Sequence, residues 1–184
     1  MPRAVKTGRH LEYQRVMDVT PAVRNPKDHN LPLIRGLIEQ FGFTQPLLVD
    51  ERTGRLVAGH GRLLVLDAME KEQAAPPDGI RADESGIWLV PVTRGWSSRS
   101  DREAEAYLLA DNRSSEVGGW VPPELSMILA EQDEELRRLI GWSDADTERL
   151  VASLAPPAAP EGFPEFDDMI ETKHECPKCG YAWS

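Results

Sequence analysis

Residues 43–73 place two short apolar segments, a tight turn and an apolar helix in one uninterrupted stretch. The segments 43–50 (FTQPLLVD) and 55–59 (RLVAG) are separated by ERTG, which predicts a β-hairpin. A GHGR box (residues 59–62) then leads into a helix predicted over 62–73. Because a hairpin and a helix must lie so close together, we expect a small sheet with helices packed on it.

The flanking segments add elements of both kinds. A helix is predicted from Asn30, a suitable N-cap with Pro32 in the first turn, to a stop at Gly42. The segment 87–96 (IWLVPVTRGW) predicts a strand apolar enough to be central, although its proline weakens that interpretation. Another helix is expected to begin after Ser100, which has a glutamate three residues later as in a capping box.

The C-terminal third predicts helices and then a segment rich in proline and alanine. We expect the ADNRSSEVGGW segment to break the helix that follows Ser100. A further helix is expected to start near the PPEL segment and to bury one face that runs from Leu125 to Leu139, and another is expected to start after Ser143. The predicted fold class is α+β: a small mixed sheet with packed helices, a helical extension, a flexible linker and a terminal tail. The expected divisions are a basic segment (1–17), a domain (18–120), a helical extension (121–154), a linker (155–172) and a tail (173–184).

The GHGR box has the composition of a phosphate-binding turn. Gly59 and Gly61 allow a backbone to approach an anion closely, and the start of a helix presents free N–H groups. Arg62 can contact phosphate oxygens in a bidentate manner, and His60 can donate a hydrogen bond or transfer a proton. By composition alone, an ordinary glycine turn that binds nothing is the commoner interpretation.

Two other segments carry polar groups of the same kind. Asp111 can hold a divalent metal, Asn112 can add an amide contact and Arg113 a phosphate contact. Alternatively, the Asp-Asn pair simply ends a helix. Gln45, at the entry to the first strand of the hairpin, can contact a base or a ribose, or it can be a solvated side chain.

The order of these segments resembles the ParB/sulfiredoxin superfamily, in particular the ParB-like domain found in phages and mobile elements. The resemblance covers about residues 18–120. It rests on several short motifs in a fixed order: Asn25-Pro26, Phe41-Gly42, Gln45-Pro46, the GHGR box, Val90-Pro91-Val92 and Asp111-Asn112-Arg113.

The resemblance implies roles for these residues. The box is Gly-Glu-Arg-Arg in ParB proteins and Gly-Cys-His-Arg in sulfiredoxins, and in both it holds nucleotide phosphates. The resemblance therefore implies a phosphate-binding turn at the GHGR box, a magnesium site at Asp111 with Asn112, and a nucleotide contact at Gln45. The general base is not assigned by resemblance; Glu39 and His60 are the foremost candidates, ahead of Asp28.

Departures from the family's sequence pattern reduce the set of activities that the resemblance implies. The box lacks the sulfiredoxin cysteine, and Leu63 stands where ParB proteins have a second basic residue. The chain also lacks room for the helix-turn-helix and dimerisation modules of partition proteins. We expect Mg²⁺-dependent binding of a nucleoside triphosphate, CTP or ATP, with hydrolysis or phosphoryl transfer in a DNA-linked process. The alternatives are a metal-dependent DNA nuclease and a non-catalytic DNA- or nucleotide-binding adaptor that docks through zinc.

Charge and hydropathy bear on partners and location. The net charge of −10 argues against a protein that binds nucleic acid over its whole surface, although the basic opening segment can orient the chain on DNA. No run of about 18 apolar residues is present, and the first residues lack the apolar core of a secretory signal. We therefore expect a cytoplasmic protein without a membrane span.

The tail contains both cysteines of the chain. Cys176 and Cys179 have the Cys-x-x-Cys spacing of a zinc knuckle, and His174 is a nearby third ligand. A structural zinc site needs four ligands, so the remaining one must come from a second chain in a homodimer or from another histidine. The other histidines are His10, His29 and His60. The alternative is a pair of free thiols.

Overall fold

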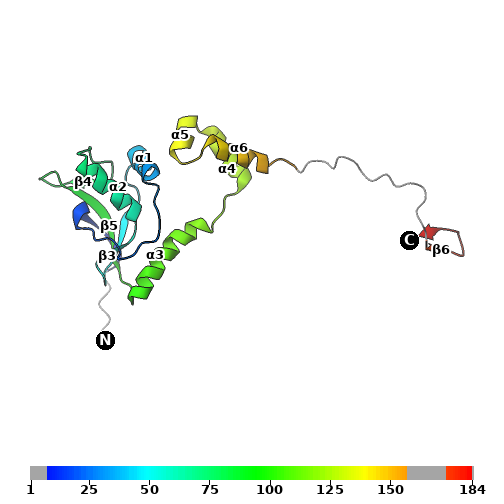
Figure 1. Cartoon of the computed structure of the whole chain (residues 1–184), viewed down its shortest axis with the longest axis horizontal. Helices are drawn as coiled ribbons and strands as arrows, with labels where there is room; N and C mark the ends of the chain where they lie inside the picture. The colour runs from blue at the N-terminus through cyan, green and yellow to red at the C-terminus, as the bar shows by residue number, and fades with distance from the viewer. Residues whose placement is uncertain (1–7, 157–172, 184) are drawn as a thin grey trace. The chain divides into compact units, whose positions relative to one another are not determined.

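The structure, a computed structural model, describes residues 8–156 and 173–183. These residues form two compact units, one ending at Ser153 and the other beginning at Leu154 (Figure 1). The larger unit contains one sheet and all six α-helices of the described chain, and the smaller contains a short hairpin. The predicted linker lies almost entirely outside the described residues.

The sheet of the larger unit is mixed. Its strands are β1 (His10–Arg15), β2 (Leu47–Asp50), β3 (Arg55–Ala58), β4 (Arg81–Ala82) and β5 (Trp88–Trp96). The order is β1-β5-β2-β3, with β4 also beside β5. β2 runs parallel to β5, whereas the other neighbouring pairs are antiparallel. The α+β class and the small mixed sheet are therefore confirmed.

The larger unit also contains six α-helices and one 3₁₀ helix among the described residues. They are α1 (Leu31–Phe41), α2 (His60–Lys71), α3 (Asp101–Glu116), α4 (Pro122–Glu131), α5 (Glu134–Leu139) and α6 (Asp144–Ser153), with a 3₁₀ helix, η1 (Val16–Asp18). α2 contacts β2 and η1, α1 packs on α2, and α3 contacts β3 (Figure 1). None of the described helices is both long and apolar enough to cross a bilayer.

The core lies between the sheet and α2. Leu47, Leu56 and Leu66, from β2, β3 and α2, are fully buried, and so are Val90 and Val92 of the central strand. Burying these side chains supplies the main driving force for folding this unit. Pro91 is tolerated because it lies between the residues of β5 that pair with β4 and those that pair with β2.

The local signals that predicted α1 are visible in its geometry. The Asn30 side chain accepts a hydrogen bond from the Leu33 N–H, and a proline occupies the first turn. Gly42 ends the helix with φ +76°, a conformation that favours glycine. The hairpin of β2 and β3 also forms where its two apolar segments predict it.

Two sequence interpretations of the helices were wrong. α3 continues through the ADNRSSE segment to Glu116, so the Asp-Asn pair does not end the helix. The helix that begins at Pro122 stops at Glu131, and Asp133 caps a separate α5 by accepting from the Leu136 N–H. On the N-terminal side, β1 pairs along its whole length with β5.

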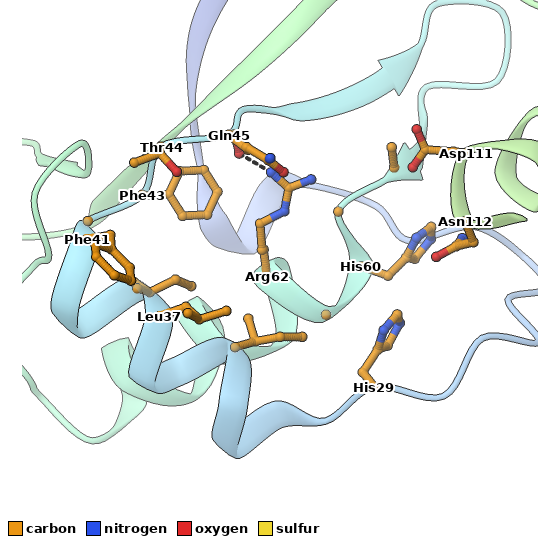
Figure 2. A pocket seen from close by; sticks show the side chains of 16 residues that line it. His29, Leu37, Phe41, Phe43, Thr44, Gln45, His60, Arg62, Asp111 and Asn112 are labelled. Atoms are coloured by element: carbon orange, nitrogen blue, oxygen red, sulfur yellow. Dashed lines mark hydrogen bonds between the residues drawn. The ribbon is translucent and has the colours of Figure 1, made fainter. Parts of the chain in front are cut away.

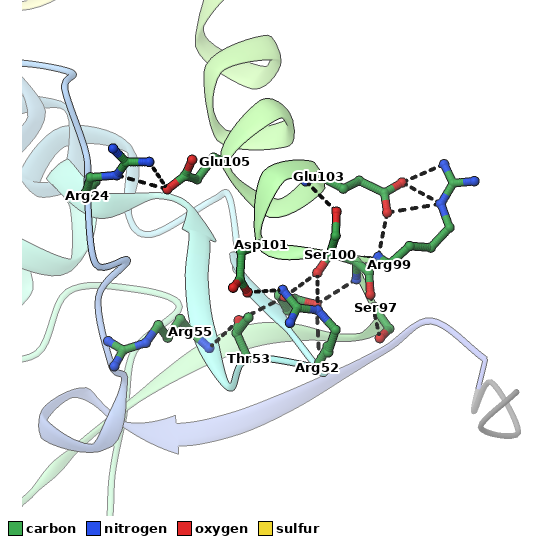
Figure 3. A network of polar contacts seen from close by, with 12 residues as sticks. Arg24, Arg52, Thr53, Arg55, Ser97, Arg99, Ser100, Asp101, Glu103 and Glu105 are labelled. Carbon is green, nitrogen blue, oxygen red and sulfur yellow. Dashed lines mark hydrogen bonds and ion pairs between the residues drawn. The ribbon is translucent and has the colours of Figure 1, made fainter. Parts of the chain in front are cut away.

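A buried carboxylate joins the end of β2 to the segment before α3. Asp50 is fully buried and accepts hydrogen bonds from the Ser98 N–H at 2.7 Å, the Ser98 hydroxyl at 2.8 Å and the Thr53 hydroxyl at 2.9 Å. Arg52 extends the network outward by donating to Ser98 and pairing with Asp101 (Figure 3). Burial acts to raise the pKa of Asp50, but the hydrogen bonds outweigh it and lower that pKa.

Candidate functional site

One pocket of about 470 Å³ brings together the three polar segments that the sequence singled out. Gln45 lies before β2, residues 59–62 begin α2, and Asp111 with Asn112 lies on α3; all of them line the pocket (Figure 2). Apolar side chains of α1 and the following loop form another wall: Ile34, Leu37, Ile38, Phe41 and Phe43. The pocket thus combines polar groups with an apolar surface, as ligand sites commonly do.

The GHGR box is the first turn of α2 rather than a loop before it. Gly59 is the N-cap, with φ +99°, and it has no side chain to cap the helix. The N–H groups of residues 60–62 consequently have no acceptor within the helix, since the first intrahelical bond is donated by Leu63 to the Gly59 carbonyl. These N–H groups and the positive end of the helix favour an anion at the pocket.

Both glycines of the box are also required for packing. A Cβ atom on Gly59 would lie 2.5 Å from Leu47 Cδ2. A Cβ atom on Gly61 would lie 2.7 Å from Ile34 Cδ1 and 3.0 Å from His29 Cγ. Gly61 therefore lets α1 and His29 approach the start of α2, which sets the width of the pocket.

Arg62 points from α2 across the pocket toward Gln45 (Figure 2). Its guanidinium donates to the backbone carbonyl of Gln45 and lies 6.0 Å from the centre of the Phe43 ring. Partial burial lowers the pKa of Arg62, and the nearby charge of Asp111 opposes that change. An arginine remains charged under these conditions, so the guanidinium is a fixed cation in the pocket wall.

His60 is held as a neutral side chain. Its Nε2 atom accepts a hydrogen bond from the Ala22 N–H at 3.2 Å, and its ring is buried. Burial first, and the neighbouring His29 second, lower the pKa of His60. Because Nε2 is an acceptor, the ring proton is on Nδ1, which makes the imidazole a donor rather than a base toward a ligand. Its evident role is to join the chain at Ala22 to α2.

α3 contributes one carboxylate and one amide. The Asn112 amide nitrogen donates to the Leu108 carbonyl at 2.9 Å, which orients the side chain within the helix. The Asp111 carboxylate has no hydrogen-bond or ion-pair partner among the described residues, and it acts electrostatically on Arg62. An acidic group and a basic group therefore face the same space.

Comparison with known proteins identifies the family. No family model matches the chain. A protein of Escherichia coli (strain K12), the ParB-like nuclease domain-containing protein YnaK, is 32% identical over 63 residues, which are 33% of this chain and 71% of that protein. The chain belongs to the ParB-like domain family.

Two predicted site residues lie outside the pocket of this ParB-like domain. Glu39 is on the exposed side of α1, where its carboxylate accepts from Arg35, because the pocket-facing positions of the helix are the apolar ones. Arg113 is exposed on α3 and pairs with Glu116. The pocket geometry therefore does not support Glu39 as a base or Arg113 as a phosphate contact.

The sequence prediction missed His29 as a pocket residue. His29 lines the pocket, and its Nε2 atom lies 3.2 Å from the amide nitrogen of Asn25. The nearest sequence signal was the Asn25-Pro26 motif, because the Asn25 side chain contacts the imidazole of His29, four residues further along the chain. The sequence predicted the apolar wall only as the buried face of a helix, because the helical spacing of apolar residues does not distinguish a hydrophobic core from a ligand-binding surface.

Three basic side chains between residues 15 and 27 pair with acidic groups. Arg15 contacts Asp83, Arg24 contacts Glu105 and Lys27 contacts Glu116. These exposed pairs contribute little to stability, but they reduce the local excess of positive charge that would attract a nucleic-acid backbone.

The tail forms a hairpin of β6 (His174–Glu175) and β7 (Ala182–Trp183) around the Cys-x-x-Cys turn. Both cysteines are free thiols. Across the described ranges, no three His, Cys, Asp or Glu side chains converge as a metal site, so the structure does not bring His174 together with the two cysteines. Among the described residues that line the pocket, Asp111 is the one carboxylate.

Proposed function

We propose that this ParB-like domain binds a nucleoside triphosphate in the 470 Å³ pocket. The observation that carries the proposal is that the first turn of α2, which has no side-chain cap, lines the pocket together with Arg62. Such a helix start, joined to a guanidinium, suits a phosphate chain.

The two walls of the pocket fit the two ends of a nucleotide. The phosphates would lie at the first turn of α2, within reach of Arg62 and Asn112. The base would lie against the apolar wall from α1, where Leu37, Phe41 and Phe43 face the same space (Figure 2). The volume also falls within the range of about 300–1,000 Å³ typical of small-molecule sites.

Asp111 is the residue that would hold Mg²⁺. A magnesium ion commonly takes one or two protein carboxylates and completes its shell with waters and substrate phosphate oxygens. The single carboxylate of Asp111 in this pocket fits that coordination preference of Mg²⁺. The ion would neutralise phosphate charge and polarise the phosphoryl group; the chain itself would position the triphosphate, with His60 bracing the turn rather than removing a proton.

A DNA nuclease is the second candidate function, and the name of the Escherichia coli relative favours it. A DNA phosphate would then occupy the same helix start, with a metal at Asp111. The apolar wall beside the phosphate end and the paired basic segment favour a mononucleotide over a duplex. An adaptor that binds without turnover would use the pocket in the same way, in a DNA-linked process.

Calorimetric titration of the whole chain with CTP or ATP and Mg²⁺ tests the binding proposal. Asn112→Ala should weaken binding about tenfold or more, because it removes a pocket contact worth more than about 1.4 kcal/mol. Arg113→Ala, one position away on the same helix but outside the pocket, is the matched control and should leave the affinity unchanged. Equal loss in both variants, or no binding by the wild type, would contradict the proposal.

Turnover separates the candidate activities. Phosphate release that requires Mg²⁺ and falls strongly in Asp111→Asn supports hydrolysis or transfer. Nicking of plasmid DNA with Mg²⁺ and without nucleotide supports the nuclease. Nucleotide binding with neither reaction supports the adaptor.

A further inference from the structure

His29 lines the pocket from the segment that precedes α1, and its backbone is held on both sides. Its N–H group donates to the Asp28 carboxylate at 2.9 Å, and its carbonyl accepts from the Leu31 N–H at 2.9 Å. The side chain is half-buried and points toward His60 and Asn112 (Figure 2). The ring therefore leaves a fixed piece of backbone and enters the pocket in a defined direction.

The side chain of Asn25 determines which nitrogen of this ring carries the proton. Asn25 Oδ1 accepts from the Lys27 N–H at 3.2 Å, which fixes the orientation of the amide group. The amide nitrogen of Asn25 then faces Nε2 of His29 at 3.2 Å. An amide NH₂ group only donates, so Nε2 is the acceptor in this contact. In the neutral ring the proton is therefore on Nδ1.

Nδ1 of His29 lies beside the first turn of α2. A Cβ atom on Gly61 would lie 3.1 Å from this nitrogen and 3.0 Å from Cγ of the same ring, so a glycine is what lets the imidazole approach so closely. Among the described residues, Nδ1 has no hydrogen-bond partner. A protonated imidazole also carries a proton on Nδ1, so this atom is a donor in both charge states of the ring.

We propose that His29 binds an anionic oxygen of the ligand through its Nδ1–H group, and that Asn25 is a positioning residue that presents this donor. The inference rests on the proposed function and deepens it, because within a nucleotide the acceptor is a phosphate oxygen. The imidazole adds a directional hydrogen bond to the charge of Arg62, whose guanidinium is held by the Gln45 carbonyl. The ligand class is thereby a phosphorylated nucleotide rather than a nucleoside.

Long-range ¹H–¹⁵N correlation spectra of the full chain, with ¹⁵N-labelled histidine, test the donor without nucleotide. The neutral ring of His29 should carry its proton on Nδ1. Asn25→Ala removes the donor to Nε2, so the ring should shift toward the tautomer with the proton on Nε2, the form favoured in water. Addition of CTP or ATP with Mg²⁺ to the wild type should move the Nδ1 signal.

Calorimetric titration with the same nucleotides measures what the donor contributes. His29→Ala should weaken binding about tenfold and Asn25→Ala about threefold. His29→Asn, whose amide nitrogen takes the place of Nδ1, should recover most of the loss, whereas His29→Gln, whose amide lies nearer the position of Nε2, should not. His10→Ala, the matched control, removes an exposed histidine of β1 outside the pocket and should bind as the wild type does.

Three results would overturn the inference while the wild type still binds nucleotide. They are a neutral His29 ring with its proton on Nε2, unchanged affinity in His29→Ala, and equal losses in His29→Asn and His29→Gln. A wild type that binds neither CTP nor ATP would instead contradict the proposed function, and the inference with it.

Discussion

Two strand-to-helix junctions in the larger unit have opposite chemistry. Where β5 leads into α3, Ser100 caps the helix by accepting from the Glu103 N–H, and Asp50 satisfies the polar groups of Ser98. Where β3 leads into α2, the cap is Gly59, which has no side chain, and the first turn of the helix, without a side-chain cap, lines the pocket. The same local topology is closed at one end of the sheet and available to a ligand at the other.

This difference distinguishes residues that stabilise the fold from residues that we propose to bind a ligand. A helix start normally satisfies its free N–H groups with a side chain, since leaving them without partners costs free energy. At α2 the N-cap Gly59 has no side chain to satisfy these groups, and the proposed phosphate would accept from them.

Removing the Asp50 carboxylate should have the largest effect on stability. Asp50→Ala leaves the buried Ser98 groups and the half-buried Thr53 hydroxyl without their acceptor, so we expect the free energy of unfolding to fall by roughly 3–5 kcal/mol. Urea denaturation measures the change. Asp101→Ala, which removes an exposed carboxylate from the same network, should cost less than about 1 kcal/mol. A similar cost for both variants would show that the junction is not held by the buried group.

Adding one methyl group to the open junction should disturb both packing and binding. In Gly61→Ala the new Cβ atom would lie 2.7 Å from Ile34 Cδ1 and 3.0 Å from His29 Cγ, so these side chains must move, at a cost of about 1–3 kcal/mol. Nucleotide affinity should fall with it, because both side chains line the pocket. Gly119→Ala, whose Cβ atom would meet nothing within 4 Å, is the control. Unchanged affinity in Gly61→Ala would contradict the role given to this glycine.

The two junctions should also respond to acid over different ranges. The pKa of His60 is lowered in the folded state, so the unfolded chain binds a proton first as pH falls below about 6.5, the ordinary histidine value. Stability from this group is lost between that pH and the lower folded pKa, by at most about 1.4 kcal/mol per pH unit. Asp50, whose pKa is lowered, loses its contribution only below the ordinary aspartate range.

Urea denaturation of the wild type and of His60→Gln between pH 7.5 and 5.5, a window of roughly two units around the histidine value, measures the first effect. The wild type should show the steeper loss. Parallel curves would mean that His60 titrates equally in both states, contrary to its burial and its bond from Ala22.

The smallest expected effect is at the cap of the closed junction. Ser100→Ala removes the acceptor for the Glu103 N–H and should cost about 1 kcal/mol, the usual value for an N-cap. Ser97→Ala, an exposed neighbour whose hydroxyl makes only a 3.5 Å contact, should change the melting temperature much less. Nucleotide affinity should be unaffected by either substitution.

The sequence predicted most of the sheet and the pocket because their signals are local. Asn30, Gly42 and the two apolar segments of the hairpin act through neighbouring residues, and the pocket motifs occur in a family order. The failures were tertiary. Asp111 and Asn112 favour a helix end by propensity, yet α3 continues through them, with the Asn112 amide donating to Leu108 within the helix. Glu39 was predicted as a general base, but it lies on the exposed side of α1 and does not line the pocket.

The central claim is that the open helix start of α2 binds phosphate. Amide chemical shifts of the ¹⁵N-labelled chain, recorded during titration with CTP or ATP and Mg²⁺, test it directly. We expect the amide signals of Gly61 and Arg62 to move strongly as nucleotide saturates, while the signal of the capped Glu103 amide does not move. Saturation with the α2 amides unmoved, or no saturation by either nucleotide, would contradict it.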